Sequence, residues 1–555
     1  MARTSTEAAP RERICFNADW RFLRGDAPDA LGSLDYEKLR PWLLFSSGHL
    51  LSEGVKRPVR PEGEPGTGIS FVKAQFDDSA WRKLTLPHDF GIEGPFSQEL
   101  PGDTGKLPWH GVCWYRKRFA LEPEDARRRI ALDIDGAMSF SAVWLNGRFV
   151  GGWPFGYSSF RLDLTPHLDF AGENVLAIRL DNPPNSSRWY PGGGLYRNVW
   201  LSKTKEVRVA QWGTFASTPR VTARSALVSV DVTLENLSDA DVDIALSTAI
   251  FELGADEKPR GKAVAKAQEA TLKLTPGAQA LRTQCAEIVK PKLWTLKKPR
   301  RYLAVTSVHV GEMLVDRVET AFGVRTIRFD AKGGFSLNGK RVELQGVCMH
   351  HDLGALGSAI NERALERQIE ILQAMGANAI RTSHNPPAPE LLDLCDRMGM
   401  LVMDEAFDCW RRGKRWPAGM DERDPNVTYF DYATVFDDWH ERDLRALIRR
   451  DRNHPSVVIY SIGNEVIEQW YSDGWKLSTR LAGIVREEDR SRPITAGLNS
   501  TDGPYSGFQT AIDVAGYNYK PSDYIPLHKS NPALPIVATE TASCISSRGE
   551  YFFPV

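Results

Sequence analysis

Leu401-Val-Met-Asp-Glu-Ala-Phe-Asp408 is the stretch that decides the fold, because a short apolar strand pattern runs directly into carboxylates. A helical pattern precedes it at Pro389 to Met398, and the strand-like run Asn378 to Arg381 comes before that helix. Apolar residues at helical spacing also fill residues 361–375. Strand and helix patterns therefore alternate on the N-terminal side of this stretch.

The same alternation continues toward the C-terminus. Helix patterns lie near Trp439 to Arg449 and Trp475 to Arg486. The other predicted strands are Val342–Val347, Val457–Tyr460, Ile494–Ala496, Val514–Tyr517 and Ile536–Ala538. Repeated units of this kind imply a parallel sheet covered by helices, and the (β/α)₈ TIM barrel is its commonest closed form. We count seven strands, and we therefore predict a TIM barrel lacking its eighth strand over residues 324–555.

Residues 14–324 show a different pattern of short alternating segments separated by Gly, Pro, Asn and Asp. These are strand and turn signals, and the segment is too long for one sandwich. The Trp-rich character of its first part stops at the charged stretch Lys203 to Val207. We predict one β-domain over residues 1–205 and an immunoglobulin-like β-sandwich over residues 206–323.

Composition excludes several classes of protein. The 555 residues carry a formal net charge of -1, so no basic field favours nucleic acid or an anionic membrane. No apolar run approaches the roughly 18 residues of a membrane span. The seven scattered cysteines form no C-x-x-C pair, which favours a reducing compartment, by default the cytoplasm. Residues 1–13 lack the apolar core of a signal peptide, although a misassigned start codon would leave a periplasmic or secreted location open.

Polar residues follow nearly every predicted barrel strand. Barrel enzymes place their working groups at the C-terminal ends of the strands, so these residues are expected to meet at one mouth. They are His350, His351, Asp352, Arg381, Ser383, His384, Asn385, Asp404, Glu405, Asp408, Ser461, Asn464, Glu465, Tyr517, Asn518, Tyr519, Thr539 and Glu540.

Two of these carboxylates, Glu465 and Glu540, each end a strand. A pair held about 5 to 5.5 Å apart is what a retaining glycosidase uses as acid/base and nucleophile. A single strand-end glutamate caps a helix or pairs with a rim cation about as often as it does chemistry. For the pair, with Asn464 beside one member, we favour catalysis and expect Arg381 to keep Glu540 ionised.

Other chemistries are weaker. The cluster of His350, His351 and His384 with nearby carboxylates could hold a metal, but no H-x-x-x-H or H-E-x-x-H spacing supports this. Neutral imidazoles that bind sugar hydroxyls fit equally well, and His351 in particular could be a buried structural histidine. A Ser-His-Asp hydrolase would need a G-x-S-x-G elbow, which the sequence lacks. The glycine-rich loop from Ser186 to Arg197 is expected to have a positional role.

The motifs together resemble those of the family 2 glycoside hydrolases, which include β-galactosidases, β-glucuronidases and β-mannosidases. The resemblance covers nearly the whole chain. It rests on Leu86–Asp89, Gly111–Arg116, Val143–Gly147, Ser187–Gly192, Gly346–His350, Asn378–His384, Asp404–Asp408, Gly463–Glu465 and Ala538–Glu540.

The resemblance implies a jelly-roll sugar-binding domain, an immunoglobulin-like domain and a catalytic barrel, in that order. It also implies a retaining mechanism with Glu465 as acid/base and Glu540 as nucleophile. Asn464 would lie near the sugar 2-hydroxyl and Tyr519 near the nucleophile, while His350 and His384 would face the substrate. Arg381 and Asp408 complete the substrate-binding residues that we expect.

Within the family, Asp404 to Trp410 is more similar to β-galactosidases than to glucuronidases. The family's magnesium-dependent members carry Glu and His where this chain has Cys409 and Arg411, so we expect no metal and no other cofactor. The predicted partner is a carbohydrate, and a homo-oligomer is compatible with the sequence. The alternatives are a β-glucuronidase, and a carbohydrate-binding remnant whose barrel is incomplete.

Overall fold

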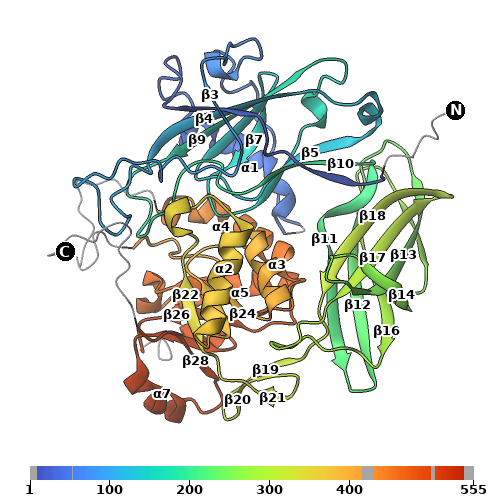
Figure 1. Cartoon of the computed structure of the whole chain (residues 1–555), viewed down its shortest axis with the longest axis vertical. Helices are drawn as coiled ribbons and strands as arrows, with labels where there is room; N and C mark the ends of the chain where they lie inside the picture. The colour runs from blue at the N-terminus through green and yellow to red at the C-terminus, as the bar shows by residue number, and fades with distance from the viewer. Residues whose placement is uncertain (1–8, 53, 415–430, 502–506, 543–555) are drawn as a thin grey trace.

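The computed structural model describes residues 9–52, 54–414, 431–501 and 507–542 of the chain. Figure 1 shows a β-rich N-terminal part lying over a mixed helix and strand part, with a second β-rich part at one side. No helix among the described residues is long and apolar enough to cross a membrane.

The N-terminal part consists of two antiparallel sheets and the helix α1 (Tyr36–Ser46). One sheet has the order β1 (Glu12–Cys15), β10 (Val199–Thr204), β5 (Arg129–Ile134) and β8 (Phe160–Asp163). The other has the order β3 (Arg82–Leu84), β2 (Trp20–Arg24), β4 (Gly111–Phe119), β9 (Asn174–Asn182), β6 (Ser141–Leu145) and β7 (Arg148–Trp153). Buried tryptophans such as Trp114 and Trp144 stack at 5.6 Å in this part, so they fill its core as the strand patterns predict.

The second β-rich part is a separate pair of antiparallel sheets. One contains β11 (Val207–Val221), β12 (Ser225–Asn236) and β16 (Gln279–Val289). The other contains β14 (Pro259–Lys266), β13 (Val242–Leu253), β17 (Tyr302–Val310) and β18 (Met313–Phe322), and β15 (Ala270–Leu274) pairs with β13. Alternate residues of β12 are buried, because successive side chains of a strand point to opposite faces.

The C-terminal part contains the predicted parallel sheet. It runs in sequence order through β22 (Gly346–Met349), β23 (Ala379–Thr382), β24 (Leu401–Glu405), β25 (Val457–Asn464), β26 (Ile494–Leu498), β27 (Ala515–Asn518) and β28 (Ile536–Glu540). All neighbouring pairs are parallel. Its helices are α2 (Glu362–Ala374), α3 (Pro389–Met398), α4 (Phe436–Asp451), α5 (Gly474–Glu488) and α7 (Tyr524–Ser530). The expected alternation of strands and helices is confirmed.

The first predicted barrel strand is misplaced. We expected it over Val342 to Val347, whereas β22 starts at Gly346. The Asn378 side chain explains the difference, because it binds the backbone carbonyl of Glu343 at 2.8 Å and the backbone N–H of Gln345 at 3.0 Å. A side chain thus takes up backbone groups that a longer strand would pair in the sheet.

Within the described residues, the seven-stranded sheet does not close by backbone pairing between β22 and β28. Residues of β22 are alternately exposed and half-buried, whereas every residue of β24 and β25 is buried. Cys348 of β22 still lies beside β28, with its Sγ 3.4 Å from the carbonyl oxygen of Thr539. The sheet is therefore an incomplete barrel, and residues 543–555, where we expect no eighth strand, lie outside the described residues.

A small antiparallel sheet of β19 (Ile327–Asp330), β20 (Gly334–Leu337) and β21 (Lys340–Arg341) precedes the barrel. Its side chains Phe335 and Leu337 belong to the same buried cluster as Leu401, Val458 and Val514. Leu401 and Val458 lie at the starts of β24 and β25, and Val514 lies just before β27. This sheet covers the amino end of the barrel, so the opposite end carries the polar residues that follow the strands.

Candidate active site

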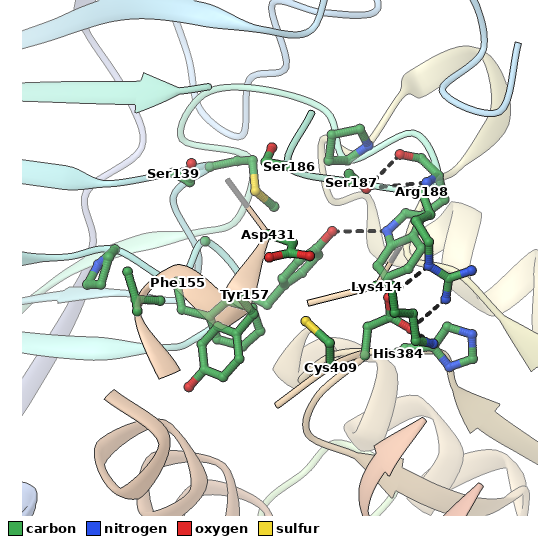
Figure 2. Close-up of a pocket in the computed structure, with 18 of the residues that line it drawn as sticks. Ser139, Phe155, Tyr157, Ser186, Ser187, Arg188, His384, Cys409, Lys414 and Asp431 are labelled. Carbon is green, nitrogen blue, oxygen red and sulfur yellow. Dashed lines mark hydrogen bonds and ion pairs between the residues drawn. The ribbon is translucent and has the colours of Figure 1, made fainter. Parts of the chain in front are cut away.

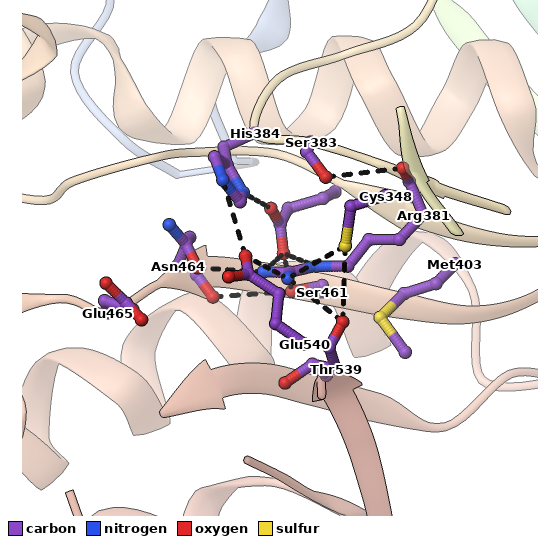
Figure 3. Close-up of polar contacts among 12 residues, drawn as sticks. Cys348, Arg381, Ser383, His384, Met403, Ser461, Asn464, Glu465, Thr539 and Glu540 are labelled. Carbon is purple, nitrogen blue, oxygen red and sulfur yellow. Dashed lines mark hydrogen bonds and ion pairs between the residues drawn. The ribbon is translucent and has the colours of Figure 1, made fainter. Parts of the chain in front are cut away.

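The two predicted catalytic carboxylates share one hydrogen-bonded network at the carboxyl end of the sheet. Figure 3 shows the part of this network around Arg381 and Glu540, with Glu465 beside Asn464. Arg381 donates from Nη1 to Oε1 of Glu540 at 2.7 Å and from Nη2 to Oδ1 of Asn464 at 2.9 Å. Asn518 donates to the same Asn464 oxygen at 3.1 Å and to Oε1 of Glu465 at 3.0 Å. Glu540 and Glu465 are therefore joined through three side chains.

Arg381 lies buried between two acids. Its Nε and Nη2 atoms donate to Oε2 of Glu405 at 2.9 and 2.7 Å, in addition to the bond to Glu540. Burial opposes the charge, but the carboxylates of Glu405 and Glu540 raise the pKa of Arg381 above its ordinary value. The expected contact between Arg381 and Glu540 is confirmed, and it places a buried guanidinium directly beside the Glu540 carboxyl group.

Glu540 has a second donor in Tyr519, whose hydroxyl is hydrogen-bonded to Oε2. The backbone N–H of Tyr519 also donates to the carbonyl oxygen of Glu540 at 2.7 Å, which fixes the two residues relative to each other. Tyr519 therefore lies beside Glu540, as the resemblance implies.

Glu405 was expected at the mouth of the barrel, but its contact with Arg381 was not predicted. It ends β24, is fully buried, and accepts a hydrogen bond from Ser461 at 2.6 Å as well as those from Arg381. Burial raises the pKa of Glu405, although Arg381 and Ser461 favour its ionised form. Its position at a strand end, like those of Glu465 and Glu540, was the available signal.

His384 connects Glu405 to Glu540. Its Nδ1 lies 2.6 Å from Oε1 of Glu405 and its Nε2 lies 3.5 Å from Oε1 of Glu540. Burial and the charge of Arg381 lower the pKa of His384 well below its usual range, so the ring is neutral. When Glu405 is ionised it can only accept a hydrogen bond, and the proton of the neutral His384 ring then lies on Nδ1.

His350 and His351 have different surroundings. The His350 ring lies 4.8 Å from the Trp189 ring and 5.4 Å from the His384 ring, and burial lowers its pKa to about 4. His351 instead lies with Nε2 2.9 Å from the carbonyl oxygen of Pro191 in the glycine-rich loop. His350 is therefore a neutral ring beside the site, whereas His351 holds the loop, in agreement with the structural interpretation of that residue.

Asp408 joins the barrel to the N-terminal part. Arg188 of the glycine-rich loop forms a two-pronged ion pair with it at 2.9 and 2.6 Å, and Lys414 and Asn464 donate to Oδ1 at 2.7 and 3.0 Å. Burial opposes ionisation, but Arg188 and Lys414 hold the pKa of Asp408 well below its usual range. Sequence patterns did not single out Arg188, because its partner Asp408 lies 220 residues away on another part of the fold, and they did not single out Lys414, although it is only six residues from Asp408.

A buried carboxylate also holds the glycine-rich loop, in addition to the contacts of His351 and Arg188. Asp89 accepts hydrogen bonds from the backbone N–H of Gly193 at 2.9 Å, from the Tyr190 hydroxyl at 2.7 Å and from the backbone N–H of Ser358 at 2.8 Å. A Cβ on Gly193 would come within 2.8 Å of the carbonyl oxygen of Trp109, so a larger residue would displace the loop. The positional role that we expected for this loop has a physical basis.

A pocket lies between the glycine-rich loop and the barrel (Figure 2). Arg188 and Lys414 lie on its wall with Asp408 and His384, and aromatic side chains including Tyr157 and Trp189 form another part of its lining. The indole N–H of Trp189 donates to the Tyr157 hydroxyl at 3.0 Å. The pocket thus combines flat apolar surfaces with charged groups, which is how protein sites hold sugars.

Asp404 does not reach the mouth of the barrel. It precedes Glu405 in β24, so its side chain points to the opposite face of the sheet. Burial and the nearby Asp451 carboxylate raise the pKa of Asp404 well above its ordinary value. Asp404 is therefore a buried residue on the side of the sheet opposite the mouth, near Asp451 of α4, and these surroundings favour its protonated form.

Cys409 and Arg411 occupy the two positions that were considered for metal ligands. Cys409 is buried, and Arg411 pairs with Asp437 at 2.7 Å. In the parts of the chain that the structure describes, no group of three or more His, Cys, Asp or Glu side chains could hold a metal ion.

Three family models match successive parts of the chain. The family 2 galactose-binding domain-like model matches residues 100–191, the glycosyl hydrolases family 2 model matches residues 209–325, and the family 2 TIM barrel model matches residues 330–523. The chain belongs to glycosyl hydrolase family 2.

Relatives within family 2 include enzymes of two specificities. A β-galactosidase of Bacteroides ovatus is 40% identical over 587 residues, which cover 99% of this chain and 62% of the relative. A putative β-glucuronidase of Formosa agariphila is 32% identical over 87% of this chain and 42% of its own length. The chain therefore spans less than two thirds of the length of these relatives.

Solved family 2 structures share the fold. A family 2 member from Bacteroides cellulosilyticus superimposes with a TM-score of 0.81 and 34% identity, over 95% of this chain and 61% of that chain. A β-glucuronidase from Bacteroides uniformis superimposes with a TM-score of 0.73 and 25% identity, over 95% of this chain and 58% of that chain.

Proposed function

We propose that this family 2 chain carries the active site of a retaining exo-β-glycosidase that removes terminal non-reducing β-D-galactose by double displacement. Glu540 is the nucleophile and Glu465 is the acid/base. The observation that carries the proposal is the network that joins them, in which Arg381 binds Glu540 at 2.7 Å and Asn518 binds Glu465 at 3.0 Å.

In the first step, a carboxylate oxygen of Glu540 attacks the anomeric carbon while the carboxyl group of Glu465 gives its proton to the departing glycosidic oxygen. In the second step, Glu465 takes a proton from water, and this water displaces Glu540 from the anomeric carbon. Arg381 and Tyr519 both donate hydrogen bonds to the Glu540 carboxyl group, and this pair of donors supports its assignment as nucleophile.

The other residues bind and orient. Asn464 accepts from Arg381 and donates to Asp408, so its side chain is fixed in one orientation next to Glu465. His350 and His384 are neutral and line the same region, where they can exchange hydrogen bonds with sugar hydroxyls. This arrangement supports the substrate-binding roles of Asn464, His350, His384, Arg381, Asp408 and Tyr519.

A β-glucuronidase is the second candidate. The pocket is lined by two cations, Arg188 and Lys414, and by two carboxylates, Asp408 and Asp431, so its formal charges balance and give an acidic sugar no net attraction. The similarity to a β-galactosidase of Bacteroides ovatus at 40% identity favours galactose, and the β-glucuronidases among the relatives are less similar. A carbohydrate-binding remnant is the third candidate, because the described sheet does not close.

We also propose that the parts divide at residues 205 and 323, as expected from the sequence, into a jelly-roll sugar-binding domain, an immunoglobulin-like sandwich and the barrel. The change of sheet between Thr204 and Val207, and the change between Phe322 and Ile327, support these boundaries.

Covalent trapping tests the proposal. The chain is incubated with an aryl 2-deoxy-2-fluoro-β-galactoside or with the matching 2-fluoroglucuronide, and the labelled peptide is identified by mass spectrometry. Labelling at Glu540 by the galactoside is the expected result. Preferential labelling by the glucuronide would establish the second candidate, and labelling of another residue would overturn the assignment of Glu540.

A further inference from the structure

Exposed aromatic side chains concentrate at the carboxyl end of the barrel. Among the described residues, the exposed aromatic side chains are Phe45, Phe96, Trp470, Tyr471, Trp475 and Tyr519. The last four follow barrel strands, and three of them fall within one six-residue segment after Glu465. We call Trp470, Tyr471 and Trp475 the aromatic rim.

The segment that carries the aromatic rim is anchored to the barrel by polar contacts of Glu468 and Gln469. Gln469 donates to Oδ1 of Asn499 at 2.8 Å and accepts from the backbone N–H of Ser500 at 2.9 Å, and both partners follow β26. Glu468 accepts from the backbone N–H of Arg412, after β24, at 2.8 Å. The segment thus lies across the carboxyl ends of neighbouring strands, on the same side of the barrel as Glu465.

The turn between the rings is tightly constrained. The backbone N–H of Gly474 donates to the carbonyl oxygen of Tyr471 at 3.0 Å, and a Cβ on Gly474 would come within 2.0 Å of the carbonyl oxygen of Glu468. Gly474 is the first residue of α5, and Trp475 is the second. The backbone between Tyr471 and Trp475 is therefore fixed by this turn.

The rim does not contribute to a core. Trp470, Tyr471 and Trp475 are 55%, 42% and 40% exposed, and the Arg412 guanidinium lies over the Tyr471 ring at 3.8 Å. The neighbours Ser472 and Asp473 are also exposed, so flat apolar faces alternate with hydrogen-bonding groups. Pyranose rings match this surface, because they present an apolar face and a polar edge.

We propose that the aromatic rim binds the leaving-group side of the substrate, that is, a neutral oligosaccharide of two or more sugars attached to the terminal residue that is cleaved. The inference rests on the function proposed above. It follows from continuity with that site: Glu465, the proposed proton donor to the leaving oxygen, is only five residues before Trp470 in a segment fixed at the barrel mouth.

Calorimetric titration of the full chain tests this proposal. The background is Glu540→Gln, which prevents hydrolysis, and the two probes are D-galactose and the trisaccharide β-galactosyl-cellobiose. We expect the trisaccharide to bind about tenfold more tightly than galactose, the amount of one good stacking contact. Trp470→Ala and Trp475→Ala should each remove most of this difference and leave galactose binding unchanged, whereas Trp470→Phe should retain it.

Met375→Ala is the matched control. Met375 is 69% exposed at the end of α2, just before β23 begins, and therefore lies toward the opposite end of the barrel. Equal affinity for both probes would overturn the proposal that the aromatic rim binds sugars, and so would trisaccharide binding that survives Trp470→Ala and Trp475→Ala. Either result would favour a protein-docking surface and would leave the proposed function intact. Failure of the parent to bind either probe would contradict the β-galactosidase function itself, and with it the rim.

Discussion

Arg381 binds Glu540 through Nη1 at 2.7 Å while its other nitrogens bind Glu405 at 2.9 and 2.7 Å. One buried cation is thus shared between the proposed nucleophile and a second carboxylate that holds the cation in place. Because the guanidinium is planar and rigid, its bonds to Glu405 fix the direction of the bond to Glu540.

Glu540→Gln should abolish turnover of an aryl β-galactoside, because the amide cannot form the glycosyl-enzyme intermediate. Initial rates measured by release of the aryl alcohol check this. Glu343→Gln, at an exposed glutamate outside the site, should retain full activity. Activity of the Glu540 variant at the level of the Glu343 control would refute the nucleophile.

Glu465→Ala should lower the rate on a poor leaving group by about 10² to 10⁴-fold, because proton donation is lost. With a good leaving group the first step needs no proton, so the second step becomes limiting. Added azide should then restore the rate and yield a β-glycosyl azide, which chromatography detects. Absence of any azide effect would argue against Glu465 as the acid/base.

Arg188→Met should reduce kcat/KM by about 10 to 100-fold, because a two-pronged, partly buried ion pair with Asp408 is lost. Asp408 also accepts from Asn464, so its displacement would disturb the side chain next to Glu465. The control is Arg411→Met, which breaks an exposed ion pair with Asp437 and should change the rate by less than about threefold. Equal small effects of both substitutions would show that the N-terminal part does not support the site.

Asp443 should make stability depend on pH. It is buried on α4, where it accepts from Trp153 and Ser158 of the N-terminal part and from Tyr432, each at 2.6 Å. Burial raises the pKa of Asp443 to about 6, although these three donors oppose the shift. Because the folded pKa is above the unfolded value near 4, the folded state binds the proton more tightly.

The stabilising contribution of this proton is fully present below about pH 4 and is lost as the pH rises through about 6. Asp443→Asn should therefore flatten the pH dependence of the free energy of unfolding between about pH 4 and 6, by about 3 kcal/mol. Urea unfolding of both proteins across this range measures the difference. Parallel curves for the two proteins would contradict the raised pKa.

Strands β22 and β28 should exchange their amide hydrogens faster than β24 and β25. In the described residues the outer strands each have one backbone partner, whereas β24 and β25 have two. An unpaired strand edge leaves N–H groups open to water and to other chains. Hydrogen exchange followed by mass spectrometry gives the comparison, and equal protection of β22 and β25 would show that the edge is covered.

The alternation of strands and helices around Leu401 to Asp408 was enough to predict the parallel sheet, because local periodicity determines which element forms. The sequence by itself also placed Glu465 and Glu540 at strand ends, since parallel strands bring their carboxyl ends to one edge. The start of β22 could not be predicted, because the Asn378 side chain competes for backbone groups more than thirty residues away.

Only the tertiary structure decided which charges surround the site. Arg188 meets Asp408 across 220 residues of sequence, and Trp153 meets Asp443 across 290, because the N-terminal part is packed on the barrel. Glu405 and Asp404 are neighbours in β24, but their side chains lie on opposite faces of the strand. Glu405 therefore lies in the mouth of the barrel, whereas Asp404 lies behind the sheet. Periodicity is a local property of the chain, whereas charge, burial and pKa depend on packing between distant segments.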